Sequence, residues 1–369
     1  MRSLLSTAAS LLPLFYTKVC ALPQTTTSST ACNNSPALCS QPYANVTYLG
    51  AHDSPFTSNS SNSYDVSGNQ YFNTTVQLNA GVRLLQAQMQ RPNSSDPSQP
   101  IHLCHTSCNL YDAGTLENWL GEVKAWMDSN PNEVVTILLV NGPGATAAEL
   151  GPIFTGSGIT QYSYTPTSAA TSTWPTLQEM ISANTRLVTF IASLTDNSGA
   201  TFLLNEWDYM WENNYQVTTS SNFTCTPDRP SSLQGSLATA ASSGRMFMMN
   251  HFLYLQQLFN IQTPDVDNLG TTNSPDTNTI GSLGYSADQC TSQYGTKPTF
   301  VLVDFFNVGP AISTVDRMNQ VTGQISGRQA VTTSNMKVES ESTGAAGRIE
   351  RSAFVLALGF ACALSAGWL

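Results

Sequence analysis

Charged residues are scarce in this sequence, and basic residues are the scarcest of them. Only 10% of the 369 residues are charged, and 14 Lys and Arg face 24 Asp and Glu, which gives a formal net charge of −10. Proteins that bind nucleic acids by charge need a basic surface, so this balance argues against a nucleic-acid partner. The hydrophobic fraction of 41% argues against a disordered chain and is sufficient for one large core.

Several motifs of known chemistry are also missing. No G-x-S-x-G pattern is present, which argues against a serine lipase. The stretch Gly142–Ala147 places glycines after an apolar run, as dinucleotide-binding loops do, but Pro143 and the incomplete pattern favour an ordinary strand-to-helix turn. We therefore expect no cofactor. Histidine is rare as well, with four in the whole chain.

Both ends of the chain have the pattern of processing signals. Residues 1–21 begin with a basic residue, continue with an apolar stretch and end in small residues, which is typical of a secretory signal peptide. Residues 343–369 finish in the uncharged run Ala353–Leu369 after a short spacer, which is typical of a GPI-attachment signal with its attachment point near Ser342. The alternatives are a buried N-terminal helix and a tail-anchored C-terminal helix. The prediction is an extracellular, GPI-anchored protein at the cell surface.

The cysteines agree with secretion. Of the eight, Cys20 and Cys362 fall within the two end segments, and the even set that remains predicts disulfides in an oxidising compartment. Fifteen pairings are possible for six cysteines, and proximity favours Cys32–Cys39, Cys104–Cys108 and Cys225–Cys290. The run from Cys104 to Cys108 could also suggest zinc, but a fourth ligand is missing, so we expect a disulfide and no metal there. Sequons for N-glycosylation occur at Asn33, Asn45, Asn59, Asn73, Asn93 and Asn222.

Between the ends, short apolar runs alternate with amphipathic stretches. Residues 22–44 predict an irregular lead-in, residues 45–322 a folded domain, and residues 323–342 a Ser/Thr/Gly linker. Strands are predicted at 45–51, 82–89, 101–105, 133–140, 186–192, 245–250 and 299–306, with one more between 200 and 240, and helices at 115–128, 177–182 and 312–321. The segments 195–240 and 260–298 are polar and predict long loops. This α/β pattern favours a single TIM-type (β/α)₈ barrel with long rim loops over two doubly wound domains.

In such a barrel the chemistry lies where the strands end. His52 follows the first predicted strand, His105 ends the third, and Asp304 lies in the last. A lone histidine at a strand end usually has a structural role, but two histidines with a carboxylate indicate a functional site. Two imidazoles suit the cleavage of a phosphodiester, because one accepts the proton of the attacking hydroxyl and the other protonates the leaving oxygen near neutral pH.

The sequence resembles the PLC-like phosphodiesterase superfamily, and more narrowly its secreted fungal members related to the phosphatidylinositol-specific phospholipase C X domain. The resemblance covers about residues 45–320 and depends on GAHDSPF at 50–56, GVRLLQAQMQ at 81–90, HLCHTSC at 102–108, the predicted helix at 115–128 and VLVDFF at 301–306. It implies a TIM-type barrel in which His52 is the general base and His105 the general acid. Asp53 matches the carboxylate that follows the first histidine, and Asp304 matches the acid that orients it.

The second predicted strand departs from that family. Active bacterial members end it in Asp-x-Arg, with the arginine on the phosphate, whereas this sequence has Gln86 and Gln88. We expect both glutamines to bind substrate, with Arg91 as a nearby cation. Loss of one such charged contact costs on the order of 10²–10³ in rate. Glutamines are also poor ligands for the calcium or magnesium that other relatives use.

The leading prediction is a monomeric phosphoric diester hydrolase of the phospholipase C type, acting on an inositol phospholipid or another cell-surface phosphodiester. The alternative is a catalytically silent barrel that binds glycans or lipid headgroups at the cell wall. A third hypothesis is a glycosidase that uses Glu206, Asp208 and Asp304 as its acids. The aromatic run at 207–211 predicts a loop packed on the barrel rather than a rim that faces lipid or sugar.

Overall fold

The computed structural model describes residues 30–167, 173–257 and 262–337. The chain divides into two compact units, Met1–Thr30 and Ala31–Leu369, and every element below belongs to the second. The predicted signal peptide at 1–21 and the predicted attachment signal at 343–369 lie outside the described residues. Within the described ranges, no helix combines the length and the apolar character needed to cross a membrane.

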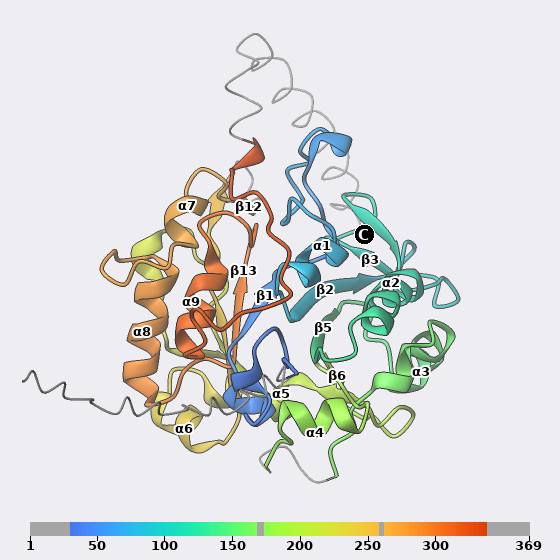
Figure 1. The fold of residues 1–369 in the computed structure, drawn as a ribbon. Coiled ribbons are helices and arrows are strands. Elements are labelled where there is room, and N and C mark those ends of the chain that lie inside the picture. Colours follow the sequence, from blue (N-terminus) through green and yellow to red (C-terminus); the bar gives the residue numbers. More distant parts are fainter. Residues whose placement is uncertain (1–29, 168–172, 258–261, 338–369) are drawn as a thin grey trace, which may run out of the picture. The chain divides into compact units, whose positions relative to one another are not determined.

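Eight parallel strands of the described chain form a barrel-like sheet (Figure 1). They are β1 Tyr48–Ala51, β2 Leu84–Gln90, β5 Val135–Asn141, β6 Leu187–Ile191, β7 Leu203–Asn205, β8 Met210–Asn213, β10 Met246–Asn250 and β13 Phe300–Val303. Each strand except β7 pairs with the next one in this order, and β13 returns to pair with β1. Since no ladder joins β7 to β8 among the described residues, the barrel is open along that seam. The predicted TIM-type α/β fold is confirmed.

The remaining strands are antiparallel additions, and two predictions need correction here. The strand predicted at 101–105 exists as β3 (His102–Cys104), but it runs antiparallel to β2 and forms a hairpin with β4 (Asp112–Thr115), so it is not a barrel strand. The segment 195–240 holds two barrel strands, β7 and β8, rather than a loop with one strand. The other additions are β9 Pro227–Arg229 beside β8, and the hairpin of β11 Tyr254–Gln256 and β12 Gln262–Pro264.

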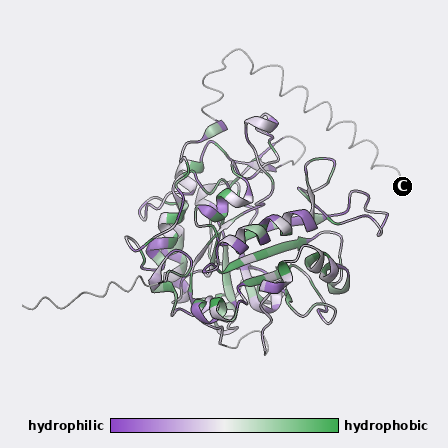
Figure 2. Cartoon of the chain, turned by 45° about the vertical axis from the view of Figure 1, so that its right-hand side comes forward, coloured by the Kyte–Doolittle hydropathy of each residue, from purple (hydrophilic) through white to green (hydrophobic). Residues whose placement is uncertain are grey.

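Helices cover the outer face of the strands (Figure 1). They are α1 Thr74–Asn79, α2 Leu116–Ser129, α3 Ala147–Gly156, α4 Leu177–Ser182, α5 Glu206–Tyr209, α6 Leu237–Ser242, α7 Leu269–Thr272, α8 Leu283–Tyr294 and α9 Ala311–Met318, with short 3-10 turns η1 Pro36–Leu38, η2 Tyr43–Asn45, η3 Ser60–Asn62, η4 Ile159–Tyr162, η5 Ser220–Asn222 and η6 Ser231–Leu233. The predicted helix starting at Thr115 is confirmed as α2, with the Thr115 hydroxyl accepting from the Asn118 amide at its N-terminus. The prediction of a loop over 260–298 is wrong, because α8 lies there. Figure 2 shows apolar strands and helices of mixed polarity.

The side chains that face the barrel lumen are apolar near the strand starts and polar near the carboxyl ends. The inward-facing residues nearer the strand starts pack into one apolar cluster, which includes Tyr48, Leu84, Met210, Met248, Phe300 and Leu302. Side chains of a strand repeat on one face every second residue. Continuing that period places His52, Gln86, Glu212, Asn250 and Asp304 at the carboxyl ends of the same inward rows. The strands therefore carry an apolar core at one end and a polar site at the other.

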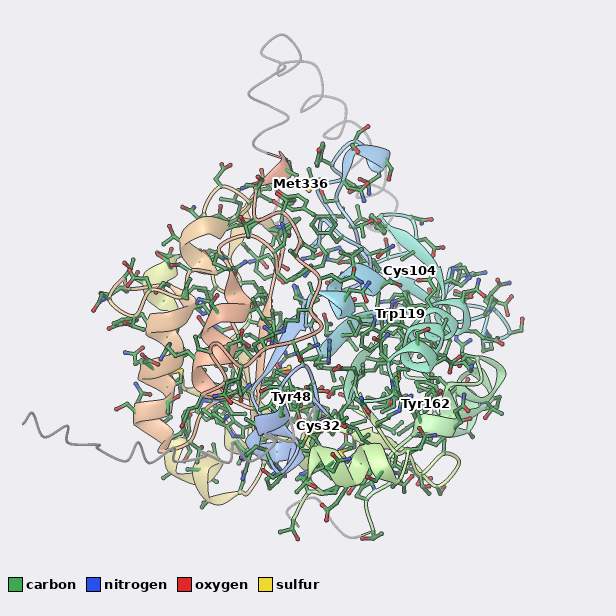
Figure 3. The ribbon with its side chains drawn as sticks, in the orientation of Figure 1. Cys32, Tyr48, Cys104, Trp119, Tyr162 and Met336 are labelled. Atoms are coloured by element: carbon green, nitrogen blue, oxygen red, sulfur yellow. A yellow bond between two sulfur atoms is a disulfide. The ribbon has the colours of Figure 1, made fainter. Side chains whose placement is uncertain are left out.

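Three disulfides in the described chain have the predicted pairing, Cys32–Cys39, Cys104–Cys108 and Cys225–Cys290. In Figure 3, Cys32 lies toward the same end of the barrel as Tyr48, and Cys104 lies toward the other end. The segment 323–342 is predicted to be a linker, and its described part contacts the domain. Although irregular, it is bonded to the barrel: Arg328 forms two hydrogen bonds with Asp316, and the Gln329 amide donates to the Asn79 carbonyl.

Candidate active site

His52 and Asp304 meet because their strands are neighbours in register. Ala51 of β1 pairs with Val303 of β13, so the residue after each strand faces the lumen at the same level. His52 Nδ1 donates to Asp304 Oδ1 at 2.8 Å, and the imidazole stacks on Phe252 with ring centroids 4.0 Å apart. A carboxylate can only accept, so Nδ1 carries the proton. The other ring nitrogen, Nε2, is left for chemistry.

His105 reaches the same end of the barrel from the hairpin beside β2. It follows β3 directly, inside the small loop closed by the Cys104–Cys108 disulfide, and its amide donates to the Tyr111 carbonyl at 3.1 Å. Its ring contacts Phe56 edge to face at 5.5 Å. The predicted meeting of the two histidines is present in the structure, although His105 arrives on an antiparallel hairpin rather than on a barrel strand.

Asp53 lies between the two imidazoles. Its Oδ2 is 3.6 Å from His52 Nε2 and 3.4 Å from His105 Nε2, and its side chain is fully buried. The Gln88 amide donates to the same Oδ2 at 2.9 Å. The other oxygen, Oδ1, is buried without a hydrogen-bond partner among the described residues. A buried carboxylate thus marks the point at which both imidazoles aim.

The charges around His52 set its protonation. Burial lowers the pKa of His52, but the negative charges of Asp53 and Asp304, the hydrogen bond to Asp304 and the charge of Glu212 together outweigh burial and raise that pKa above its usual value. The imidazolium form is therefore favoured further toward neutral pH than in an isolated histidine. Two imidazoles with an oriented tautomer and a carboxylate are equipped to move protons at both sides of a bound group.

Comparison with known proteins agrees with this arrangement. The PI-PLC X family model, with the description PI-PLC X 1, matches residues 38–319. The chain belongs to the PI-PLC X family.

Relatives and solved structures extend the likeness over most of the chain. It is 37% identical over 304 residues to PI-PLC X domain-containing protein 1 of Arthroderma benhamiae, covering 82% of this chain and 93% of the relative. A second Arthroderma benhamiae protein, named an uncharacterized secreted protein, is 33% identical over 335 residues, covering 88% and 71%. The phosphatidylinositol-specific phospholipase C from Listeria monocytogenes superposes with a TM-score of 0.51 at 14% identity, covering 76% of this chain and 95% of that one. At this identity the structural likeness shows the fold alone.

Both glutamines of β2 lie in this PI-PLC X site, but their bonds go to protein groups. Gln86 Oε1 accepts from the Asp53 amide at 2.6 Å. Gln88 donates to Asp53, and its Oε1 accepts from the Thr106 amide at 3.0 Å. Sequence reasoning expected both to bind substrate, whereas the structure uses them to hold the loops that carry the histidines.

Arg91 is not brought to the histidines. Its guanidinium donates to the Gln99 carbonyl at 2.6 Å and forms an ion pair with Glu149 of α3 at 2.9 Å. The prediction that Arg91 contacts substrate therefore finds no support in its contacts. Arg83, at the start of the same strand, is buried against Glu133 at the opposite end of the barrel.

Sequence reasoning missed the groups on the other side of the lumen. Glu212 at the end of β8 is buried, forms an ion pair with Arg229 of β9, and accepts from Asn250 Nδ2 at 3.1 Å. Burial, followed by the charge of Glu212, raises the pKa of Glu206 well above its usual value, so Glu206 carries a proton. Arg229 also lies over the Tyr215 ring at 4.3 Å. The spacing of two residues between Met210 and Glu212 would have placed Glu212 in the lumen, but β8 itself was not predicted.

The aromatic run that follows β7 packs on the protein, as predicted. Trp211 is buried and stacks on Phe247 at 4.0 Å, and Tyr209 contacts Trp174 and Phe190. Trp207 lies against Arg229 at 5.5 Å. Asp208, one of the acids of the glycosidase reading, is exposed.

Proposed function

We propose that this PI-PLC X family protein is a phosphoric diester hydrolase that acts on an inositol phospholipid or a related cell-surface phosphodiester. One observation supports this proposal above all others. His52 Nε2 and His105 Nε2 converge on the same oxygen, Asp53 Oδ2, at 3.6 and 3.4 Å, while Asp304 fixes the tautomer of His52. Convergent imidazoles at the carboxyl ends of barrel strands are suited to acid and base catalysis on one bound phosphate.

The proposed reaction is an intramolecular displacement at phosphorus. His52 Nε2 takes the proton from a headgroup hydroxyl next to the phosphate, and that oxygen forms a new bond to phosphorus. His105 Nε2 gives a proton to the leaving oxygen as its bond to phosphorus breaks. The first products are a cyclic phosphate and a neutral alcohol. His52 ends with the proton of the attacking hydroxyl and His105 ends without its own proton, so the number of protons is unchanged.

The raised pKa of His52 has a consequence for this scheme. His52 must be neutral to act as a base, so the rate rises as pH increases through that raised pKa. His105 must be protonated to act as an acid, so the rate falls again at higher pH. A bell-shaped profile is expected for kcat/KM.

A silent barrel that binds headgroups or glycans without turnover is the second candidate. Asp53 favours it, because a buried carboxylate at the point where the rings aim repels an anionic phosphate. Gln88 is neutral and bonded to Asp53, and Arg229 is already paired with Glu212. Each of these features weakens binding of an anionic phosphate, but none of them weakens hydrogen bonding to the hydroxyl groups of a neutral ligand.

We propose an extracellular, monomeric, GPI-anchored protein as the setting for this activity. Three disulfides support an oxidising compartment, and one relative has "secreted" in its name. The sequon residues Asn45, Asn93 and Asn222 are exposed, whereas Asn33 is buried. Membership of the described domain in a phospholipase family is consistent with attachment to a lipid surface.

The two candidates are separated by one assay. The purified protein is incubated with phosphatidylinositol vesicles and with soluble phosphodiesters, with and without a chelator, beside His52→Ala and His105→Ala. The hydrolase proposal predicts release of a cyclic phosphate that falls by on the order of 10²–10⁴ in each variant. Equal rates in wild type and both variants would remove the two-histidine mechanism. Binding without turnover in any condition would support the silent barrel.

A further inference from the structure

Gln88 bonds to both of the loops that carry the candidate catalytic histidines. Its Nε2 donates to Asp53 Oδ2 at 2.9 Å, and its Oε1 accepts from the Thr106 amide at 3.0 Å. Asp53 is the residue after His52, and Thr106 is the residue after His105. One amide of β2 therefore joins the positions that directly follow the two histidines.

Both of those positions have a backbone conformation that needs support. Asp53 has φ 49° and Thr106 has φ 62°, in the left-handed region that side chains with a Cβ disfavour by roughly 1–2 kcal/mol. The Asp53 amide is also held by Gln86 Oε1 at 2.6 Å. The side-chain oxygen of Gln88, Oε1, accepts the hydrogen bond of the Thr106 amide. The two glutamines thus stabilise the turns that aim the histidine rings.

The bonds to Asp53 and to Thr106 need a donor and an acceptor on the same side chain, and glutamine provides both. Glutamine has a donor at one branch and an acceptor at the other, whereas arginine has donors alone. An arginine in place of Gln88 could pair with Asp53 but could not accept from the Thr106 amide. A glutamine at this position therefore provides a link between two loops that an arginine could not provide.

We propose that Gln88 is a positioning residue that sets the separation of His52 and His105 and holds the Asp53 carboxylate between them. Its role is distinct from contact with substrate, since both branches of the amide are bonded to the protein. The proposal depends on the proposed two-histidine hydrolase for its effect on rate, but its effect on the histidines themselves does not. It explains how two loops from different parts of the chain keep the imidazoles aimed at one carboxylate.

A second contact between the loops means that a Gln88 variant should still fold. The Tyr111 hydroxyl accepts from the Thr57 amide at 3.1 Å, and the His105 amide donates to the Tyr111 carbonyl. The Cys104–Cys108 disulfide closes the His105 loop independently. Loss of Gln88 is therefore expected to loosen the spacing of the rings rather than unfold the hairpin.

The test uses two Gln88 variants and one matched control in the full chain. Gln88→Met keeps the length and removes both bonds, and Gln88→Glu keeps the acceptor for Thr106 but removes the donor to Asp53. The control is Asn33→Ala, because Asn33 is another buried amide with both branches bonded, to the amide and carbonyl of Val134 at the opposite end of the barrel. The measurements are the ring titrations of the histidines by NMR, thermal stability, and kcat and KM on phosphatidylinositol vesicles.

We expect both Gln88 variants to raise the titration midpoint of His52, because Asp53 loses its amide donor and interacts more strongly with the imidazole. For Gln88→Met we also expect kcat to fall about 10²-fold, as ring displacement near 1 Å does, with KM changed less than about threefold. Asn33→Ala should lower thermal stability and leave the titrations and kcat as in wild type.

Two results would overturn the positioning role. One is a Gln88→Met protein whose histidine titrations match wild type. The other is a loss of stability alone, equal in kind to that of Asn33→Ala. If wild type shows no turnover on any phosphodiester, the proposed hydrolase fails, yet the titrations still decide whether Gln88 holds the site.

Discussion

Replacement of Asp304 by asparagine tests the electrostatic argument at His52 most directly. Asp304 Oδ1 accepts from His52 Nδ1 at 2.8 Å and from Asn69 Nδ2 at 3.0 Å, and both His52 and Asp304 are buried. Asparagine keeps the shape and removes the charge. It has two orientations in this position, and each has a cost.

In one orientation the new amide nitrogen faces His52 Nδ1 and Asn69 Nδ2. The imidazole then accepts on Nδ1 and carries its proton on Nε2, where it cannot take a proton from substrate. In the other orientation the oxygen stays in place, and the new NH₂ group occupies the position of Oδ2, which is buried without a hydrogen-bond partner among the described residues. An unpaired buried polar group costs about 1–3 kcal/mol.

Asp304→Asn is expected to reduce kcat by on the order of 10²–10⁴, the range for loss of a general base or of its orienting acid. The pKa of His52 should fall, because one of the charges that raise it is removed. The acidic limb of kcat/KM and the NMR titration of His52 should therefore both move to lower pH. A group whose pKa is raised by folding stabilises the protein most below its unfolded pKa. The stability lost in the variant should accordingly be largest under acidic conditions and shrink as pH rises through the folded pKa of His52.

The chain offers a matched control in its second His–Asp pair. His102 Nδ1 lies 2.9 Å from Asp112 Oδ2 on the partly exposed hairpin. Asp112→Asn removes one carboxylate charge from beside a histidine, as Asp304→Asn does, but at a different histidine. We expect the titration of His52 and the acidic limb of kcat/KM to remain unchanged. If Asp304→Asn left the limb and the titration of His52 where they are in wild type, the assigned effect of Asp304 on His52 would be wrong.

Two further predictions concern stability. Burial lowers the pKa of His251 to about 4 and outweighs the hydrogen bond to the Thr272 carbonyl, which acts in the opposite direction, so the folded state resists protonation. The free energy of unfolding should therefore fall by up to about 3 kcal/mol as pH drops from about 6.5 toward 4, and His251→Gln should remove most of that loss in acid melts. A variant with the same acid sensitivity as wild type would exclude His251 as its source. Asn33→Ala should cost about 2–4 kcal/mol in denaturant unfolding, because it leaves the amide and carbonyl of Val134 unpaired. Mass spectrometry should find Asn33 without a glycan, and glycan on Asn33 of the folded protein would contradict its bonds to Val134.

Continuous apolar runs were enough to predict most of the barrel. Barrel strands such as β6 and β10 are buried along their length, and β5 is buried over its first five residues, so each gives an unbroken apolar signal. The cap at Thr115 located α2, and cysteine proximity gave the disulfides. The convergence of His52 and Asp304 followed from the place of His52 after the first predicted strand and of Asp304 within the last, since these two strands are neighbours in any closed barrel.

Elements without a run of apolar residues escaped prediction for a physical reason. β7 and β8 have three and four residues, and β8 contains Glu212, whose buried carboxylate is compensated by Arg229 and by a hydrogen bond from Asn250. The direction of β3 cannot be read from three residues. Arg229 comes to Glu212 through the antiparallel pairing of β9, a contact between residues 17 apart that no local pattern indicates. α8 has few large apolar side chains and takes much of its burial from Cys290 and its small residues.

The acidic balance of the sequence has a structural counterpart at the mouth of the barrel. Among the described residues, the buried acids at this end include Asp53, Glu206, Glu212 and Asp304, and a buried carboxylate needs a cation, hydrogen bonds or a proton. Asp304 has His52, Glu212 has Arg229, and Glu206 keeps its own proton. Asp53 has the neutral amide of Gln88 and the two imidazoles, which makes it the least compensated of the four. In the proposed reaction, a phosphate that enters the site competes with Asp53 for the imidazole protons. Binding of an anionic headgroup should then strengthen as the imidazoles gain protons, whereas the base step requires His52 to lose one. Lower pH therefore favours binding of the phosphate and higher pH favours the base step. The pH that best serves both depends on the pKa of His52, which the charges of Asp53 and Asp304 raise.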